Sequence, residues 1–187
     1  MIIVKNLENS GAARHWAIYH SGVDASPENY FLRFTNNAKF DLPIWNDTAP
    51  TSTVFTLGDN TQAADANDPD DHIAYCFHSV DSYQKVGSYT GLGGTSGPLV
   101  DLGFEPRWIM IKGANTTGAS NWFIWDYQRD IPNPNNSPLQ PNTDATQLTN
   151  NTFVQVTFGA TNFQVSSSAA SPQINELNKT YIYLAIA

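Results

Sequence analysis

The chain repeats one pattern of short apolar runs, and this repeat restricts its possible folds more than any other feature. Residues 1–20 hold an apolar run, a polar stretch and a second apolar run, and residues 108–126 repeat that order. Trp16 aligns with Trp122 at a shift of roughly 106 residues. A repeat of this length indicates the duplication of a whole structural unit rather than a short helical period. The sequence therefore predicts two copies of one structural module.

The alignment continues to the end of the chain. Phe55 falls opposite Phe163, and residues 72–77 fall opposite residues 181–186, with a small drift in the shift that indicates loop insertions. We expect one compact domain made of a first β repeat, a Gly-rich connecting segment with one or two strands, and a second β repeat, over residues 1–80, 81–107 and 108–187.

The apolar runs are strand-like. Trp16, Ile18 and His20 share one face of their run under the period-2 rule, and aromatic or β-branched side chains pack well on a pleated surface. Twelve Gly and eleven Pro, many of them between the runs, are typical of turns between antiparallel strands. The fold class is expected to be all-β: an antiparallel β-sandwich of jelly-roll or lectin-like type, internally duplicated, with little or no helix. Strands are expected near 1–6, 15–21, 30–35, 53–58, 72–80, 83–90, 98–102, 108–113, 121–127, 153–158, 162–166 and 180–186.

Charge and hydropathy exclude two classes of partner. The formal net charge is -8, and Lys and Arg form no cluster, which argues against nucleic acid because phosphate binding depends on clustered cations. No apolar run approaches the roughly 20 residues that a spanning helix needs, so membrane insertion is not expected either.

Several motifs carry a resemblance to a known group of proteins. Ile3–Asn6, Trp16–His20, Gly87–Gly91, Gly103–Pro106 and Tyr181–Ala185 resemble repeated β modules of large structural proteins of tailed bacteriophages, which are tail-fibre or appendage-like. The resemblance covers most of the chain in both copies, and its motifs are structural. It implies a protein of the virion, an extracellular particle, with other virion proteins as partners.

The start of the first copy differs from that of the second. Gly103–Pro106 leads into the strand that begins at Trp108, whereas Met1 already stands inside the matching strand. We therefore expect the sequence to be part of a longer chain. We expect the strand at residues 1–6 to pair with the other half, or to lie at an edge completed by a missing segment or another chain.

Aromatic residues are the best candidates for a ligand or subunit contact. Trp45 lies between Pro43 and Asn46, and Trp125 and Tyr127 lie near the end of an apolar run, in less regular surroundings than the matched Trp pair. Exposed aromatic faces can stack on sugar rings, but large aromatics also dominate cores, and packing is the simpler role for each. Trp45, Trp125 and Tyr127 are the candidate ligand or interface residues.

An acidic loop offers a weak candidate for a metal site, formed by Asp65, Asp68, Asp70 and Asp71. Carboxylates at this density could bind calcium, yet Pro69 occupies a ligand position of an EF-hand loop, and no glycine follows where that loop requires one. A solvated loop is favoured, and calcium stays open as the only cofactor considered.

Two further features have structural interpretations. The segment Gly91–Gly97 lacks the third glycine of a dinucleotide-binding loop, because Ser96 stands there, and no helix follows, so we expect a flexible hairpin turn. Cys76, the single cysteine, aligns with Ala185, which predicts a small buried apolar position rather than a reactive thiol.

These observations predict a non-enzymatic virion structural protein with no catalytic residues: a tail-fibre, appendage or capsid-decorating module that can also recognise a host surface. A homo-oligomer is expected, with a trimer as one candidate and a host-surface glycan as a candidate ligand. The alternative is a carbohydrate-binding module of lectin-like sandwich type. The third hypothesis is a glycoside-acting enzyme, whose paired carboxylates would have to include some of the four Glu residues Glu8, Glu28, Glu105 and Glu176.

Overall fold

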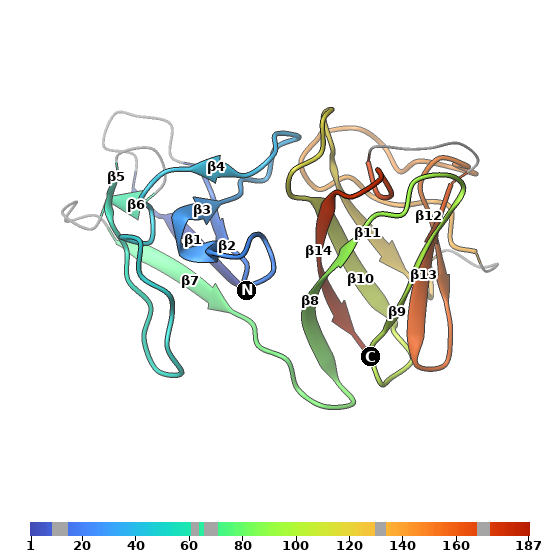
Figure 1. The fold of residues 1–187 in the computed structure, drawn as a ribbon, viewed down its shortest axis with the longest axis horizontal. Helices are drawn as coiled ribbons and strands as arrows, with labels where there is room; N and C mark the ends of the chain where they lie inside the picture. Colours follow the sequence, from blue (N-terminus) through green and yellow to red (C-terminus); the bar gives the residue numbers. More distant parts are fainter. Residues whose placement is uncertain (9–14, 61–63, 66–70, 130–133, 168–172) are drawn as a thin grey trace. The chain divides into compact units, whose positions relative to one another are not determined.

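The computed structural model describes residues 1–8, 15–60, 64–65, 71–129, 134–167 and 173–187. Its contacts divide the chain into two compact units (Figure 1). Unit 1 comprises Met1–Phe34 and Lys39–Phe77, and unit 2 comprises Thr35–Ala38 and His78–Ala187. That the two repeats form one domain stays a prediction.

The described chain is almost entirely β-structure. Every strand pair is antiparallel, and the helical content is one 3-10 turn at Pro27–Asn29. The all-β, antiparallel prediction is confirmed. Within the parts of the chain that the structure describes, no helix is long and apolar enough to cross a membrane.

Unit 1 is built on one three-stranded sheet in the order β2-β1-β7, with β1 (Ile2–Asn6) between β2 (Ala17–Tyr19) and β7 (His72–Cys76). Two short hairpins accompany the sheet, β3 (Tyr30–Phe31) with β4 (Phe40–Asp41) and β5 (Asp59–Asn60) with β6 (Ala64–Asp65).

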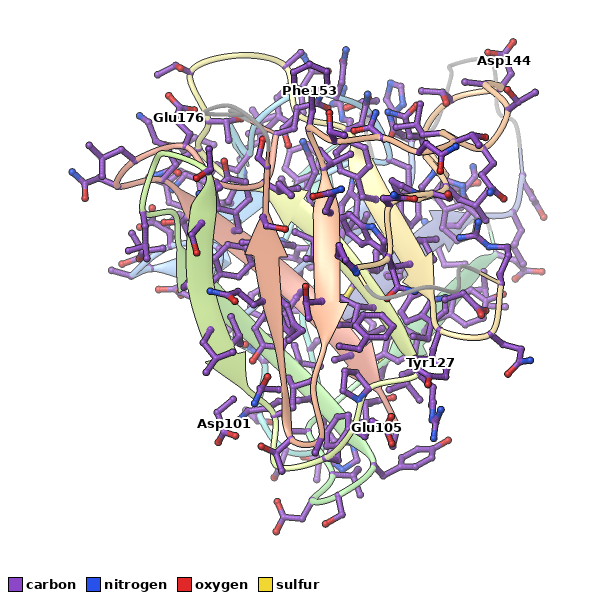
Figure 2. All side chains as sticks on the ribbon, turned by 90° about the vertical axis from the view of Figure 1, so that its right-hand side faces the viewer. Asp101, Glu105, Tyr127, Asp144, Phe153 and Glu176 are labelled. Carbon is purple, nitrogen blue, oxygen red and sulfur yellow. The ribbon has the colours of Figure 1, made fainter. Side chains whose placement is uncertain are left out.

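Unit 2 is a sandwich of two sheets (Figures 1 and 2). One sheet has the order β11-β10-β14-β8 and the other the order β12-β13-β9. Their inner faces share one core, in which Tyr183 of the first sheet meets Phe163 of the second edge-to-face at 5.3 Å between ring centroids. The strands are β8 (Gln84–Thr90), β9 (Ser96–Asp101), β10 (Trp108–Gly113), β11 (Trp122–Asp126), β12 (Gln155–Phe158), β13 (Asn162–Ser166) and β14 (Thr180–Ile186).

The duplication extends to the register of the hydrogen-bonded pairs. In unit 1, Ile3 of β1 lies opposite Ile18 and Tyr75; in unit 2 its repeat counterpart Met110 lies opposite Ile124 and Leu184. An additional single bridge follows the same rule, since Ile18 pairs with Leu32 and Ile124 with Leu139. Strands β2-β1-β7 and β11-β10-β14 are therefore the same structure made twice.

The position of β1 corrects one expectation. The strand at residues 1–6 pairs neither with the other repeat nor at an edge; it is the central strand of its sheet and is paired on both sides inside unit 1. Its sequence accounts for this place, because Ile2, Ile3 and Val4 are all buried, as both faces of a central strand require.

Two expected strands are shorter or absent. The segment expected near 30–35 keeps only Tyr30–Phe31, and residues 53–58 form no strand. The chain turns at Thr51 instead, whose hydroxyl accepts the Val54 N–H at 3.1 Å, and such local side-chain bonds compete with strand pairing. Phe55 and Leu57 nevertheless pack against the unit 1 core, as their counterparts do in unit 2.

Trp45 organises the core of unit 1. Its side chain is fully buried, its ring meets that of Tyr19 edge-to-face at 5.6 Å, and its Nε1 donates to the Tyr30 carbonyl at 2.9 Å. The core residues around it come from the sheet and from the segment between β3 and β5. A large ring with a satisfied N–H is therefore the link between the sheet and its covering loops.

Replacing this ring should destabilise unit 1. We expect Trp45→Ala to lower the free energy of unfolding by about 3 to 5 kcal/mol, because it leaves a large cavity and an unpaired carbonyl. Denaturant unfolding, with amide exchange followed at β1 and β2, measures this. Val54→Ala, at a side chain 62% exposed, should change stability by less than about 0.5 kcal/mol. Equal effects of the two substitutions would contradict the assigned core.

Candidate functional site

The two candidate tryptophans lie inside the cores. Trp125, like Trp45, has no exposed surface; it packs on Phe123 at 5.7 Å in the unit 2 core. Its Nε1 is buried without a hydrogen-bond partner among the described residues. A fully buried indole has no face to offer a sugar, so stacking on a ligand does not fit either residue, and packing is their role.

Tyr127, the third candidate, is partly exposed and lies where two strands end. It follows β11, and Arg107 precedes β10; because Trp108 pairs with Asp126, these two strand ends are neighbours. The Tyr127 N–H donates to the Arg107 carbonyl at 2.9 Å, and the Arg107 guanidinium carbon lies 4.5 Å from the centroid of the Tyr127 ring. The ring also stacks on Phe158 at 6.2 Å.

Glu105 completes a small group that we call the Tyr127 cluster: Tyr127, Arg107 and Glu105. The Glu105 carboxylate lies 3.2 Å from Arg107 Nη2, and the two side chains are 44% and 52% exposed. Figure 2 shows Glu105 and Tyr127 at the same end of unit 2. The group offers a cation, an anion and a phenol to a polar ligand, but a guanidinium occupies the ring face that a sugar would need.

The glycine-rich segment is clamped by a buried asparagine at the opposite end of unit 2. Asn175 Oδ1 accepts the Leu92 N–H at 2.9 Å, and its Nδ2 donates to the carbonyls of Gly93 and Gly94 at 3.2 and 3.3 Å. Gly93 and Gly94 have φ of 70° and 69°, which favours glycine. The expected turn is present, but it is no hairpin: it connects β8 in one sheet to β9 in the other.

Glu176 acts as a second clamp beside Asn175. Its carboxylate accepts the Thr117 N–H at 2.9 Å and the Thr117 hydroxyl, which holds the β10–β11 loop. Figure 2 places Glu176 at the end of unit 2 away from Glu105. The described contacts of Glu176 are therefore structural.

Sequence reasoning gave no role to Lys112, which is fully buried. Its Nζ donates to the Ser120 carbonyl and closes the loop between β10 and β11. Burial lowers the pKa of Lys112 from 10.5 to about 8, because the charged amine has lost water. Lys112 aligns with Lys5 in the repeat. That alignment does not reveal the burial, since Lys5 keeps partial exposure and donates to the Asn6 carbonyl.

The acidic loop is only partly described. Asp68 and Asp70 lie outside the described residues, and Asp65 is placed by its backbone in β6. Asp71 is exposed, and its carbonyl accepts the Leu7 N–H at 2.8 Å. Among the residues that the structure does describe, no three metal-ligating side chains come together. A calcium site in this loop stays a prediction.

The described strands form two copies of one β module. The family model of DUF7483, a domain of unknown function, matches residues 1–187. The chain belongs to the DUF7483 family. No curated protein and no solved structure matches it.

The buried Lys112 makes a prediction about pH. In the unfolded chain the lysine keeps its proton up to about pH 10.5, whereas in the folded chain it keeps it only up to about pH 8. Between these values the unfolded state holds more protons, so the free energy of unfolding must rise with pH. From about pH 8 to 9.5 we expect a gain of about 1 to 2 kcal/mol in unfolding free energy. The range stops below about pH 10, where the buried tyrosines ionise in the unfolded chain. Burial raises their pKa values in the folded state, so above that pH the folded state holds more protons and stability falls.

Chemical denaturation at several pH values measures this slope. Lys112→Met should flatten it, whereas Lys85→Met, on the surface strand β8, should leave it unchanged. A wild-type stability that is constant or falls from pH 8 to 9.5 would contradict the burial of a titrating amine.

Proposed function

We propose that the chain is a non-enzymatic structural module of a tailed-bacteriophage virion, either part of a tail fibre or appendage or a capsid-decorating piece. The observation that supports this best is the duplication of one β module with its pairing register conserved. Repeating one folded module extends a structural protein of a particle without requiring a new fold. The sequence resemblance to phage structural modules points in the same direction.

The distribution of carboxylates supports a non-enzymatic role. Glycoside hydrolysis needs two carboxyl groups about 5 to 10 Å apart. In unit 2, Glu105 pairs with Arg107 at one end, and Glu176 binds Thr117 at the other (Figure 2). Both have structural partners, and their separation prevents them from acting as a pair.

Immunoelectron microscopy tests the virion assignment. Antibodies against the recombinant chain should label purified particles of the phage that encodes it, at a fixed structure such as a fibre, appendage or capsid surface. Pre-incubation with the recombinant chain is the control and should abolish the label. Particles that carry no antigen, with all of it in the soluble fraction of the infected cell, would refute the proposal.

Carbohydrate recognition is the second candidate, supported by the Tyr127 cluster. The half-exposed guanidinium and carboxylate could bind sugar hydroxyls, with Arg107 moving off the ring to let a sugar stack. A glycan array with the full chain tests this. We expect any specific binding to fall about tenfold or more in Tyr127→Ala. Tyr83→Ala, at a ring 58% exposed outside the cluster, should leave it unchanged. No glycan binding, or binding that is indifferent to Tyr127, would exclude this cluster as a sugar site.

A further inference from the structure

The outer edge of β7 in unit 1, at Ala74 and Cys76, pairs with no strand among the described residues. We propose that it accepts one extended segment from a partner polypeptide, an antiparallel donor strand of the β8 type with a large side chain opposite Ala74. This inference rests on strand pairing inside the two units and does not depend on the virion assignment.

The hydrogen-bond pattern fixes which groups face outward. At the two ends of the β1–β7 ladder, the Leu7 N–H donates to Asp71 and the Phe77 N–H donates to Met1. Because an antiparallel strand turns alternate residues to opposite sides, Ile73 and Tyr75 face β1, while Ala74 and Cys76 turn their N–H and C=O groups away from it. Among the described residues, no strand pairs with that outer edge.

Unit 2 shows what occupies the same edge. Strand β14 is the repeat counterpart of β7, and its outer edge is paired along its whole length with β8, from Thr180 opposite Thr90 to Ile186 opposite Gln84. The repeat aligns Ala74 with Tyr183 and Cys76 with Ala185. In unit 2 the β8 segment precedes β10, the first strand of the repeat.

The exposure of these residues corrects the expectation for Cys76. Tyr183 and Ala185 are buried, at 4% and 0% exposure, whereas Ala74 and Cys76 are exposed. The sequence predicted a buried Cys76 because the aligned residue, Ala185, is small and apolar. The difference follows from what covers the sheet face: Tyr183 and Ala185 belong to the core shared with the second sheet of unit 2, whereas the core of unit 1 does not include Ala74 or Cys76.

The edges of the other main strands are protected, as soluble β proteins require. On β8, the outward Val86 N–H donates to the Ser79 hydroxyl at 3.1 Å, and on β9 the outward Asp101 carbonyl accepts from Lys85 Nζ at 2.8 Å. Single bridges cap β2, β11 and β12 through Leu32, Leu139 and Asn135. In contrast, β7 carries no Lys, Arg, Asp, Glu or Pro, and its Tyr75 is 46% exposed. Such an edge is a template for strand addition.

The side chain at position 74 gives the donor strand its specificity. In unit 2 the Tyr183 ring lies over Gly87, so a Cβ there would come within 2.4 Å of the Tyr183 hydroxyl oxygen and would displace the ring. Ala74 has no ring to cover its partner. The donor residue opposite Ala74 therefore has room for a large side chain, and an aromatic or branched residue there buries more apolar surface.

Peptides derived from β8 test the proposal on the intact chain. The probe is a fluorescein-labelled peptide with the sequence of residues 83–91, followed by fluorescence anisotropy. We expect saturable binding, which tightens about threefold or more when the residue at position 87 of the peptide is changed by Gly87→Phe.

Ala74→Pro removes an outward donor without touching the β1–β7 bonds and should weaken binding about tenfold. Ser88→Pro, an outward position on the edge strand β8, is the matched control and should not.

Backbone methylation of the probe keeps the test independent of variant folding. Peptide residues 85, 87 and 89 face the acceptor edge in the β8 register, and residues 86 and 88 face away. N-methylation at 85 and 89 should abolish binding, and N-methylation at 86 and 88 should preserve it. Two results would overturn the proposal: no saturable binding by any probe, or a dimer of the chain that Ala74→Pro dissolves, which would assign the edge to a second copy.

Discussion

The pairing of the first strand of each repeat with its last strand holds this protein together. Strands β1 and β7 are joined across most of the first repeat, and β10 and β14 across most of the second, so each ladder closes a long loop that contains the other elements between its two strands. Closing such loops costs chain entropy, which is offset by burying both faces of the central strand. The hairpin partners β2 and β11 add the third strand at little further cost, because they follow their neighbours directly in sequence.

What lies next to this shared three-stranded core distinguishes the units. Unit 2 has a fourth strand, β8, and a second sheet, and their aromatic rings interlock: Tyr89 stacks on Tyr181 at 5.1 Å and meets Phe163 edge-to-face at 6.1 Å. Unit 1 covers its sheet with short hairpins and irregular chain packed around Trp45. The same three strands are thus covered by a second sheet in unit 2 and by hairpins and irregular chain in unit 1. This difference in cover explains why the equivalent residues Cys76 and Ala185 differ in exposure.

The repeat in the sequence predicted that a strand pairing in one copy recurs in the other, but it misplaced β1, which was expected to pair with the other half or to lie at an edge. The bridges of Ile18 with Leu32 and of Ile124 with Leu139 are one such recurring pairing. The covering elements were harder to predict: Phe55 and Leu57 keep the core pattern of their counterparts, but the hydroxyl of Thr51 turns the chain and prevents a strand. Sequence reasoning also could not separate Trp45 and Trp125 from surface aromatics, since Pro or polar neighbours do not reveal burial. Lys112 was missed because its partner is a backbone carbonyl, which leaves no trace in the sequence.

The central claim is that unit 1 is the same module as unit 2 with its fourth-strand position open. Placing a copy of residues 83–107 directly before Met1 gives unit 1, in the repeat's own alignment, a copy of the segment that pairs with β14 in unit 2. Native-state amide hydrogen exchange then measures the outward N–H groups of Ala74 and Cys76 against those of Ile73 and Tyr75, which already bond to β1. The account predicts that exchange at Ala74 and Cys76 slows to the level of their neighbours while Ile73 and Tyr75 change little. Unchanged fast exchange at Ala74 and Cys76 in the extended chain would contradict it.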